Sequence, residues 1–398
     1  MAKKRIIIIS HALELGGAER SLIGLLEAVD PEQYEVDLFL LRHQGELMKD
    51  IPDRICLLPE SAPYTVLARP MADVLREGHL LLTGARLAGK LAAGHYNKKH
   101  GYFDSAVSLE YSHKYTCPFM PMINPDREYD LAVSYLTPHY FTARKVRAKK
   151  KIAWIHTDYT EIQINTESEL RMWSCYDHII SISESVTEGF CSVFPSLRSR
   201  IVQAGNILPE QQIRRLSEEK DVSSEMKASG LKLLSIGRYS RAKNFDTVPR
   251  ICKRILDRGI DITWYLIGYG GEEDLIRRRI AESDMEDRVI LLGKKENPYP
   301  YIKYCDWYIQ PSRYEGNSVS VREAQMLGKP VIITSYPTSA SQIEDGRTGY
   351  IVPLETEACA AEMAVLLRDS KKGTTVAAVC RERDFSGSSE MQKIYQLI

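Results

Sequence analysis

The feature that most constrains the fold is an alternation of short β-branched runs with amphipathic stretches. This pattern is typical of a parallel sheet with crossover helices. It occurs in two series, which are separated by residues 203–229, a segment with Gly205, Pro209 and a run of charged residues and serines. The sequence therefore predicts two α/β domains, each a doubly wound parallel sheet, with a boundary near residue 205.

The expected strands follow directly from the two series. The first series gives strands at 5–10, 34–40, 105–109, 129–135, 151–155 and 178–183, and the second at 232–237, 262–268, 288–293, 306–310, 330–334 and 349–352. We expect an N-terminal domain over 1–205, a C-terminal domain over 206–384, and a short solvated helix within the linker. Residues 385–398 have one apolar helical face, which should pack back on the N-terminal domain.

Residues of about 60–125 interrupt the first series. Apolar residues recur at helical spacing between Met71 and Leu91, with Arg and Lys residues among them. We expect an inserted helical pair, and its simpler interpretation is packing on its own domain. Contact of residues 70–99 with an anionic membrane or with an acceptor is the alternative. Residues 143–151 carry six positive charges, which suits either anionic lipid head groups or a solvated strand entrance.

The composition excludes several classes of protein. The chain has 53 Lys plus Arg and 53 Asp plus Glu, so the net basic charge typical of nucleic-acid binders is absent. Eight cysteines are scattered singly, which is typical of the cytosol and argues against a disulfide framework or a zinc site. No uncharged apolar stretch is long enough to span a bilayer, and the run after Met1 is too short for a signal peptide. We expect a cytoplasmic protein, with the inner face of the plasma membrane as a further location to test.

Two glycine-rich turns follow strands. Gly16 and Gly17 open a helix, where the backbone can approach a ligand and free N–H groups can hold a phosphate or sugar oxygen. A turn that merely reverses the chain is equally compatible. Neither this turn nor residues 268–271 has the G-x-G-x-x-G spacing of a dinucleotide site, and the second turn is as compatible with shaping a cleft floor as with ligand contact.

Two cations flank the turn after the strand 232–237. Arg238 and Lys243 precede a helix that is expected to begin near Asn244. Cations at the carboxyl edge of a parallel sheet, beside the positive end of a helix, suit a pyrophosphate. Two solvated residues in a surface loop would give the same pattern.

The most specific segment joins the strand 306–310 to a helix expected from about residue 318 to 327. Glu315 lies in the connecting loop and Glu323 inside the helix. A carboxylate at Glu323 can accept two ribose hydroxyls. The N–H groups that can hold sugar hydroxyls are those of Gly316, Asn317 and Ser318.

Together these motifs resemble the family 4, or group 1, retaining glycosyltransferases of the GT-B fold. The resemblance rests on the Gly-Gly-Ala-Glu-Arg turn at 16–20, on Gly237-Arg238 with Lys243, and on the seven residues between Glu315 and Glu323. It is close from about 230 to 353 and looser at 5–30 and 129–160, and residues 60–125 lie outside it. It implies two Rossmann-like domains that face each other across a cleft, with the donor held mainly by the second.

The resemblance also implies roles for these residues. It implies a retaining transfer of a sugar from a nucleotide-diphosphate donor, most commonly a UDP-sugar. Arg238 and Lys243 match positions that bind the diphosphate, Glu323 matches the position that binds ribose, and Glu315 matches the one beside the donor sugar.

All nine histidines precede residue 180, so a catalytic imidazole must come from the first domain. His156 ends a Trp-Ile-His segment that looks like the one in polysaccharide-building members of the family, where a histidine lies near the donor sugar. A histidine that merely ends a strand is the alternative. His11, also just past a strand, is a weaker candidate.

The expected reaction follows a front-face path in which the leaving phosphate takes the acceptor proton. No Asp-x-Asp motif occurs in the chain, so we expect no metal and no other cofactor, with cationic side chains in the place of a metal. The expected acceptor is a saccharide or lipid-linked molecule of cell-surface polysaccharide or glycolipid synthesis. Alternatives are a nucleotide-sugar epimerase or a phosphorylase of the same fold, and a non-catalytic nucleotide-sugar-binding subunit.

Overall fold

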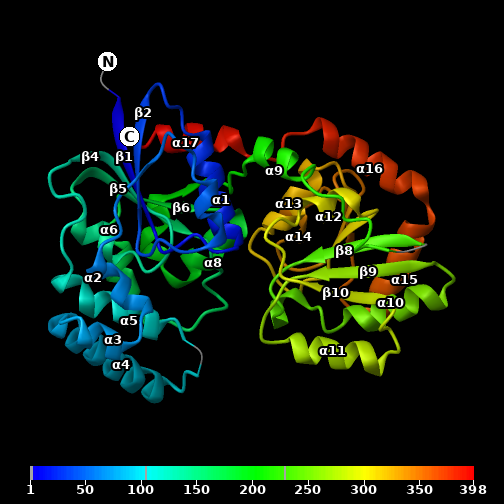
Figure 1. Cartoon of the computed structure of the whole chain (residues 1–398), viewed down its shortest axis with the longest axis horizontal. Coiled ribbons are helices and arrows are strands. Elements are labelled where there is room, and N and C mark those ends of the chain that lie inside the picture. The colour runs from blue at the N-terminus through cyan, green and yellow to red at the C-terminus, as the bar shows by residue number, and fades with distance from the viewer. Residues whose placement is uncertain (1–2, 104, 228–229) are drawn as a thin grey trace. The chain divides into compact units, whose positions relative to one another are not determined.

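The computed structural model describes residues 3–103, 105–227 and 230–398, which form two compact units. The first unit comprises Met1–Ile207 and Ser388–Ile398, and the second comprises Leu208–Gly387. The division after Ile207 lies close to the expected boundary at 205. Each unit is built on one parallel sheet covered by helices (Figure 1).

The first unit has a seven-stranded sheet in the order β3-β2-β1-β4-β5-β6-β7. Its central strands are buried apolar runs, as expected when helices cover both faces of a parallel sheet. The order reverses between β1 and β4. The strands are β1 Lys4–Ser10, β2 Tyr34–Leu40, β3 Cys56–Leu57, β4 Tyr129–Ser134, β5 Ala148–Ile155, β6 His178–Ser181 and β7 Ile201–Gln203.

The helices of the first unit include those of the segment 60–125. They are α1 Gly17–Ala28, α2 Ala62–Thr65, α3 Met71–Arg76, α4 Leu80–His100, α5 Val107–Thr116, α6 Tyr140–Lys145, α7 Thr166–Trp173, α8 Glu184–Val193 and α17 Met391–Tyr395. In the part of the chain that the structure describes, no helix combines the length and apolar character needed to cross a bilayer.

The strand expected at 105–109 is wrong, because most of that run forms the start of α5. Ser105 makes only an isolated bridge with Gln163. The helix α5 packs along α4, and a Cβ at Gly89 of α4 would lie 2.9 Å from the Tyr111 carbonyl oxygen. Close packing between the two helices has therefore overridden the local β-branched composition.

The second unit has a six-stranded parallel sheet in the order β10-β9-β8-β11-β12-β13, which reverses between β8 and β11. All six expected strands are present. They are β8 Leu231–Ile236, β9 Ile262–Ile267, β10 Val289–Gly293, β11 Trp307–Gln310, β12 Val331–Thr334 and β13 Tyr350–Val352. The helices are α9 Glu210–Leu216, α10 Val248–Asp257, α11 Glu273–Glu282, α12 Tyr299–Tyr304, α13 Val319–Met326, α14 Ser339–Gln342, α15 Thr356–Arg368 and α16 Ser370–Glu382.

The segments on either side of the two boundaries between the units, α9 and α17, are both anchored by buried apolar residues. The expected short solvated helix is present as α9, in which Ile213 is the one buried residue; Val222 and Met226, which follow α9, are buried with it in the core of the second unit. The helix α17 packs on the first unit, where Met391 and Ile394 join the core and the ring of Tyr395 stacks on another tyrosine, Tyr34, at 4.5 Å. The apolar face of residues 385–398 thus packs on the first unit, as the sequence predicted.

Candidate active site

The predicted residues of the second unit gather at the carboxyl ends of β8 and β11, where the strand order reverses. Open parallel sheets bind ligands at this kind of position. Gly237 and Arg238 directly follow β8, and the loop with Glu315 follows β11. The fold therefore brings the cations and the first carboxylate to one edge.

Lys243 lies in a 3-10 turn, Arg241–Lys243, and not beside a helix N-terminus as expected. The expected helix start near Asn244 is wrong, because that residue has a left-handed backbone (φ 59°) and α10 begins at Val248. The lysine stem covers Gly237, where a Cβ would lie 3.0 Å from the lysine Cε. The missing side chain at Gly237 thus leaves room for the lysine to cross the loop.

Lys243 ends in an ion pair with Glu315. Its Nζ lies 2.6 Å from Glu315 Oε1, and both side chains are mostly buried. The same oxygen accepts hydrogen bonds from Ser312 Oγ (2.6 Å) and Gln310 Nε2 (3.2 Å). Among the described residues no donor reaches the other carboxylate oxygen, Oε2. Glu315 is therefore fixed through one oxygen and can accept a ligand hydroxyl with the other.

Arg238 differs from Lys243 in being exposed. No hydrogen bond or ion pair of its guanidinium is found among the described residues. The loop that carries the two cations is held by Arg313, which forms a two-pronged ion pair with Asp246 at 2.9 Å. The result is a free cation on a fixed loop, which suits an anionic ligand.

The Gly268-Tyr-Gly270 turn after β9 supports this loop. A Cβ at Gly268 would lie 1.9 Å from the Gly237 carbonyl oxygen, and one at Gly270 would lie 2.4 Å from the Tyr239 carbonyl oxygen. Glycine is needed at both positions because the two loops pack backbone to backbone. The turn therefore shapes the floor of the site, as one of the two interpretations of the sequence predicted.

The N-terminus of α13 presents amide groups beside Glu315. Among the described residues, no backbone or side-chain acceptor is found for the amides of Val319, Ser320 and Val321. The amide of Ser318 is already used, because it donates to Gln342 Oε1 at 3.2 Å. Free amides at a helix start bind anions. Of the predicted set, only the Ser318 amide is taken within the described chain, and the amides of Val319, Ser320 and Val321 add free donors further into the helix.

Glu323 is the predicted residue that fits its expected role least directly. It lies on α13, is fully buried (0% exposed), and accepts a hydrogen bond from the Tyr299 hydroxyl at 3.0 Å. The carboxylate is thus packed behind the edge in this conformation. Asn317, by contrast, is half-buried and its Oδ1 has no hydrogen-bond partner in the described part of the chain.

Sequence reasoning missed the residues that hold Glu315 in place. Ser312 and Gln310 bind its carboxylate, Thr338 Oγ1 donates to its backbone oxygen at 2.7 Å, and Gln342 binds both backbone groups of the neighbouring Ser318. The signal for the first two was their place at the end of a buried strand. Thr338 and Gln342 follow the next strand, β12, and only the tertiary fold shows that they reach the loop.

In the first unit, Gly16 is the N-cap of α1 and Gly17 its first residue. The carboxylate of Glu19 lies against this turn, since a Cβ at Gly16 would lie 2.1 Å from Glu19 Oε2. An acidic side chain in the first turn stabilises the helix through its dipole. Glu19 thus already supplies a negative group where the sequence suggested a ligand oxygen.

His156 directly follows β5 and is half-buried. Its ring lies 4.6 Å from that of Tyr135, and its Nε2 has no partner among the described residues. Burial lowers the pKa of His156 to about 3. The imidazole is therefore neutral at physiological pH, with one ring nitrogen available to a ligand.

Three more histidines surround this position. His11 follows β1, His113 comes from α5 with its ring 5.3 Å from that of His11, and His139 bonds Ser134 Oγ at 2.8 Å. Burial lowers the pKa of His11 to about 4, and it lowers the pKa values of His113 and His139 well below the ordinary range. Each of the three has one ring nitrogen without a partner in the described residues. We call these three residues with His156 the histidine cluster.

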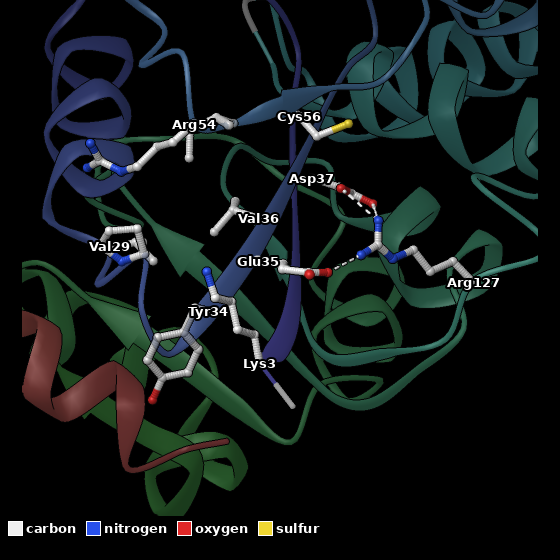
Figure 2. A pocket seen from close by; sticks show the side chains of 11 residues that line it. Lys3, Val29, Tyr34, Glu35, Val36, Asp37, Arg54, Cys56 and Arg127 are labelled. Atoms are coloured by element: carbon white, nitrogen blue, oxygen red, sulfur yellow. Dashed lines mark hydrogen bonds and ion pairs between the residues drawn. The ribbon is translucent and has the colours of Figure 1, made fainter. Parts of the chain in front are cut away.

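A separate hollow of about 260 Å³ lies near the amino ends of β1 and β2 (Figure 2). Arg127 crosses it and pairs with Asp37 at 3.2 Å and with Glu35. The buried Asp37 also accepts hydrogen bonds from Asn124 (3.3 Å) and Tyr129 (2.5 Å). These groups satisfy one another, and the hollow lies at the amino end of the sheet, so we assign it a structural role.

The described residues contain no cluster of three or more His, Cys, Asp or Glu side chains placed to hold a metal ion. All eight cysteines are free thiols. The polar groups available to a ligand are thus amides, hydroxyls, cations, carboxylates and neutral imidazoles.

Comparison with solved structures defines the class of fold. The Anabaena protein Alr3699/HepE, solved with UDP and glucose, superposes with a TM-score of 0.66 at 15% identity, covering 99% of this chain and 98% of that one. At this identity the likeness concerns the fold alone. The two parallel-sheet units have the GT-B glycosyltransferase fold, and the predicted fold class is confirmed.

Comparison with sequence families finds a match within the second unit. Residues 217–379 match the family described as "Glycosyl transferases group 1", so the resemblance seen in the motifs is confirmed. The amylovoran biosynthesis glycosyltransferase AmsK of Erwinia amylovora is 31% identical over 157 residues, which is 37% of this chain and 38% of that protein.

A lipid-linked-sugar enzyme is among the other relatives. This Campylobacter jejuni protein is an N-acetylgalactosamine-N,N'-diacetylbacillosaminyl-diphospho-undecaprenol 4-alpha-N-acetylgalactosaminyltransferase. It is 29% identical over 126 residues, or 31% of this chain and 34% of that protein. The matches thus span well under half the length of these two curated relatives.

Proposed function

We propose that the protein is a retaining, metal-independent glycosyltransferase. It moves a sugar from a nucleotide-diphosphate donor, a UDP-sugar, to a saccharide or lipid-linked acceptor of cell-surface polysaccharide or glycolipid synthesis. The observation that carries this proposal is the group of Arg238, Lys243 and Glu315 at the carboxyl edge of β8 and β11, beside the amides of α13. The named relatives and the UDP complex of the Anabaena protein support the substrate class.

The diphosphate would bind to the cations and to the start of α13. Arg238 is exposed and free to form a charge-assisted pair, and Lys243 keeps two donor protons beyond its bond to Glu315. The amides of Val319–Val321 add dipoles that point at the same anion. Three kinds of donor would thus stabilise the negative charge that develops on the leaving group. Stabilisation of this kind supplies much of the rate enhancement in transfer reactions.

The free oxygen of Glu315 is placed to accept a hydroxyl of the donor sugar. In the reaction, the acceptor oxygen attacks C1 of the sugar on the face from which the diphosphate leaves. The bond from C1 to the phosphate oxygen breaks as the new glycosidic bond forms, and the acceptor proton passes to the departing phosphate. This path retains the configuration at C1 and needs no enzymic nucleophile.

We propose His156 as the catalytic contribution of the first unit. Since its pKa is lowered to about 3 by burial, the imidazole acts as a neutral hydrogen-bonding group toward a sugar hydroxyl and not as a proton donor in cationic form. This fits a reaction in which the phosphate itself receives the proton. Gly16 and Gly17 would add backbone amides, provided that Glu19 swings away from the turn.

Glu323 remains our candidate for the ribose. To reach a ligand it must exchange the Tyr299 hydroxyl for ribose hydroxyls, because it is fully buried in the present conformation. Such an exchange keeps the carboxylate hydrogen-bonded in both states, which lowers its cost. The proposal therefore includes a local rearrangement of α13 or of Tyr299 on donor binding.

Metal independence is part of the proposal, with Arg238 and Lys243 in the place of a divalent cation. The free thiols of all eight cysteines support a reducing, cytoplasmic location. Without a bridging metal, binding of the diphosphate depends more strongly on each cationic side chain. Metal independence and the roles of Arg238 and Lys243 can therefore be tested together.

The first experiment is calorimetric titration of the full chain with UDP, GDP and ADP in the presence of EDTA. We expect micromolar binding of UDP that Arg238→Ala weakens about tenfold or more. Failure of all three nucleotides to bind would contradict the donor assignment. Incubation with UDP-sugars and a lipid-linked or free saccharide, followed by NMR of the product anomer, then tests retention. Formation of an epimerised donor without transfer would instead identify an epimerase.

A further inference from the structure

The helix α4 has its large apolar residues on the side that faces solvent. Leu80, Leu81, Leu87 and Leu91 are 66%, 69%, 47% and 66% exposed. We call these four residues the leucine face. The expectation that the apolar residues of this segment pack on their own domain is therefore wrong for most of α4.

The inward side of α4 is made mainly of small residues. Leu82, Ala85, Gly89 and Ala93 are its buried residues, and the last three let α5 approach closely. A helix of a soluble domain normally turns its bulky apolar side chains toward the core. Here the interface with α5 is complete without the four leucines, so the packing of α4 on α5 does not account for them.

Neighbouring segments carry further exposed apolar side chains. Leu75 of α3 is 50% exposed, Phe103 after α4 is 100% exposed, and Leu109 of α5 is 49% exposed. Single exposed leucines are ordinary, but four on one helix mark an interaction surface. In Figure 1, α3 and α4 lie at the end of the first unit opposite the N-terminus.

The charged residues of α4 itself are all basic, whereas Asp73 and Glu77 lie on or just after the neighbouring α3. No Asp or Glu occurs in the sequence between Glu77 and Asp104, whereas Lys90, Lys98 and Lys99 are exposed on α4. Lys98 stands seven residues after Leu91 and therefore lies on the same side of the helix. The leucine face thus combines apolar side chains with cations on a helix that has no acidic residue of its own.

We propose that the leucine face of α4 docks on an anionic lipid bilayer. The four leucines enter the boundary between head groups and acyl chains, while Lys90, Lys98 and Lys99 contact lipid phosphates. The proposal does not rest on the reaction assigned above. If the acceptor is lipid-linked, this surface would bring the protein to it. Lipid binding alone tests the proposal.

A second copy of the chain fits this surface less well. In a parallel pairing of two α4 helices the lysines of the last turn would lie together and repel. In an antiparallel pairing they would face the leucines of the partner and lose hydration. Anionic head groups satisfy the lysines and the acyl boundary satisfies the leucines, so the bilayer matches both halves of the surface.

The other basic segment, residues 143–151, is less available to lipid. Lys149 pairs with Asp130 at 2.7 Å, Lys151 donates to the carbonyls of Ala143 (2.7 Å) and Val146 (2.9 Å), and Lys145 donates to that of Pro118. It also enters β5 at the amino end of the sheet, since Ala148 lies beside Tyr129 at the start of β4. We therefore assign the docking to α4.

The test is co-sedimentation of the full chain with vesicles of phosphatidylcholine alone or of an equal mixture with phosphatidylglycerol. We expect binding to the anionic vesicles only. L87Q/L91Q should lower the partition coefficient at least about tenfold through lost apolar burial. K98Q/K99Q should lower it about 25-fold, at about fivefold for each lysine near the surface. The matched controls in the second unit, L354Q/V365Q and K371Q/K372Q, should bind as the parent does.

Several results would overturn the proposal. They are equal binding of L87Q/L91Q and the parent, equal loss in the control variants, or a concentration-dependent dimer in sedimentation velocity that L87Q/L91Q abolishes without any vesicle binding. The substituted leucines are exposed, so circular dichroism melts should match the parent, and K98Q/K99Q gives the same test if the leucine variant does not fold. UDP titration of each variant separates loss of docking from loss of the donor site.

Discussion

The carboxyl edges of the two sheets differ in whether their polar side chains are paired. In the second unit, Lys243 and Glu315 are paired at 2.6 Å and held by further donors. In the first, the four side chains of the histidine cluster lie close together, and each has a ring nitrogen without a partner in the part of the chain described. One edge carries fixed charges, and the other carries neutral, partly unsatisfied imidazoles.

The difference shows how one fold can supply two kinds of recognition. Fixed cations suit an anionic diphosphate, because the cost of ordering them is met before the ligand arrives. Neutral imidazoles suit hydroxyl groups, since they donate and accept hydrogen bonds without carrying charge. The unsatisfied nitrogens also cost folding free energy, which is the usual mark of groups kept for function.

The largest expected effect comes from breaking the charged edge at Glu315. We expect Glu315→Gln to lower kcat about 10²- to 10³-fold, because the amide cannot replace the carboxylate beside the sugar. Steady-state transfer assays with a UDP-sugar check this, and UDP binding by calorimetry should be largely kept. Glu362→Gln, at an exposed position of α15, is the control. A kcat within a few-fold of the parent would remove Glu315 from the catalytic group.

The second prediction concerns the floor of the charged edge. Gly268→Ala should destabilise the second unit by about 3 kcal/mol, because its Cβ would meet the Gly237 carbonyl oxygen at 1.9 Å. Gly271→Ala, with nothing within 4 Å of its added carbon, should have little effect. Urea denaturation of both variants measures the difference. Equal stability of the two would show that the two loops are not packed as described.

The third prediction is that the stability of the first unit depends on pH more strongly than that of the second. Burial lowers the pKa values of His11 and His156 to about 4 and about 3, below that of the unfolded chain. The free energy of unfolding is therefore unaffected by these two histidines above about pH 6.5. It falls as the pH drops toward their folded-state pKa values, by about 2 kcal/mol for each histidine at pH 5. Glu169, whose pKa burial raises to about 7, opposes this loss in part.

Hydrogen exchange measured between pH 7 and pH 5 tests this expectation. Amides of β1, β4 and β5 should lose protection, while those of β8 and β11 keep it, because the second unit contains no histidine. Glu169→Gln should steepen the loss in the first unit by removing the opposing carboxyl. Parallel loss of protection in both units would contradict the assignment to the imidazoles.

The smallest effect is expected at the free cation. Arg238→Ala should weaken UDP binding about tenfold or more, the loss of one charge-assisted pair, without a change in melting temperature. Arg241→Ala, an exposed arginine of the same loop, is the matched control and should leave the affinity unchanged. Calorimetry in EDTA measures both. Equal weakening by the two variants would point to general charge and not to a defined site.

The sequence predicted those parts of the fold that rest on periodicity. The six strands of the second sheet were found because buried β-branched runs alternate with amphipathic segments there. The error at 105–109 arose because the local run of Val, Ser and Leu carries no information on the small residues of α4, against which α5 packs. Strands β3 and β7 are only two and three residues long and gave no periodic signal.

The site was predictable where single residues follow strands, and less so where partners come from distant segments. Arg238, Lys243 and Glu315 met the expectation of gathering at one sheet edge. The hydrogen bond of Gln342 to Ser318 and the burial of Glu323 against Tyr299 depend on packing between separate loops and helices. Likewise, His113 joins the histidine cluster from α5, a helix the sequence had suggested only as part of an insertion.

The packing of α17 on the first unit has a consequence for the covalent layout of the chain. Lys4 Nζ lies 3.2 Å from the Ile398 carbonyl oxygen, so the described start of the chain and its last residue are neighbours. The second unit is thereby a loop of chain, tethered to the first at both Ile207 and Ser388. A short peptide joining the two ends would give a circular permutant whose new termini can be opened at an exposed turn of either unit. Removal of the last eleven residues, Ser388–Ile398, would instead uncover Tyr34 and leave the second unit on a single tether.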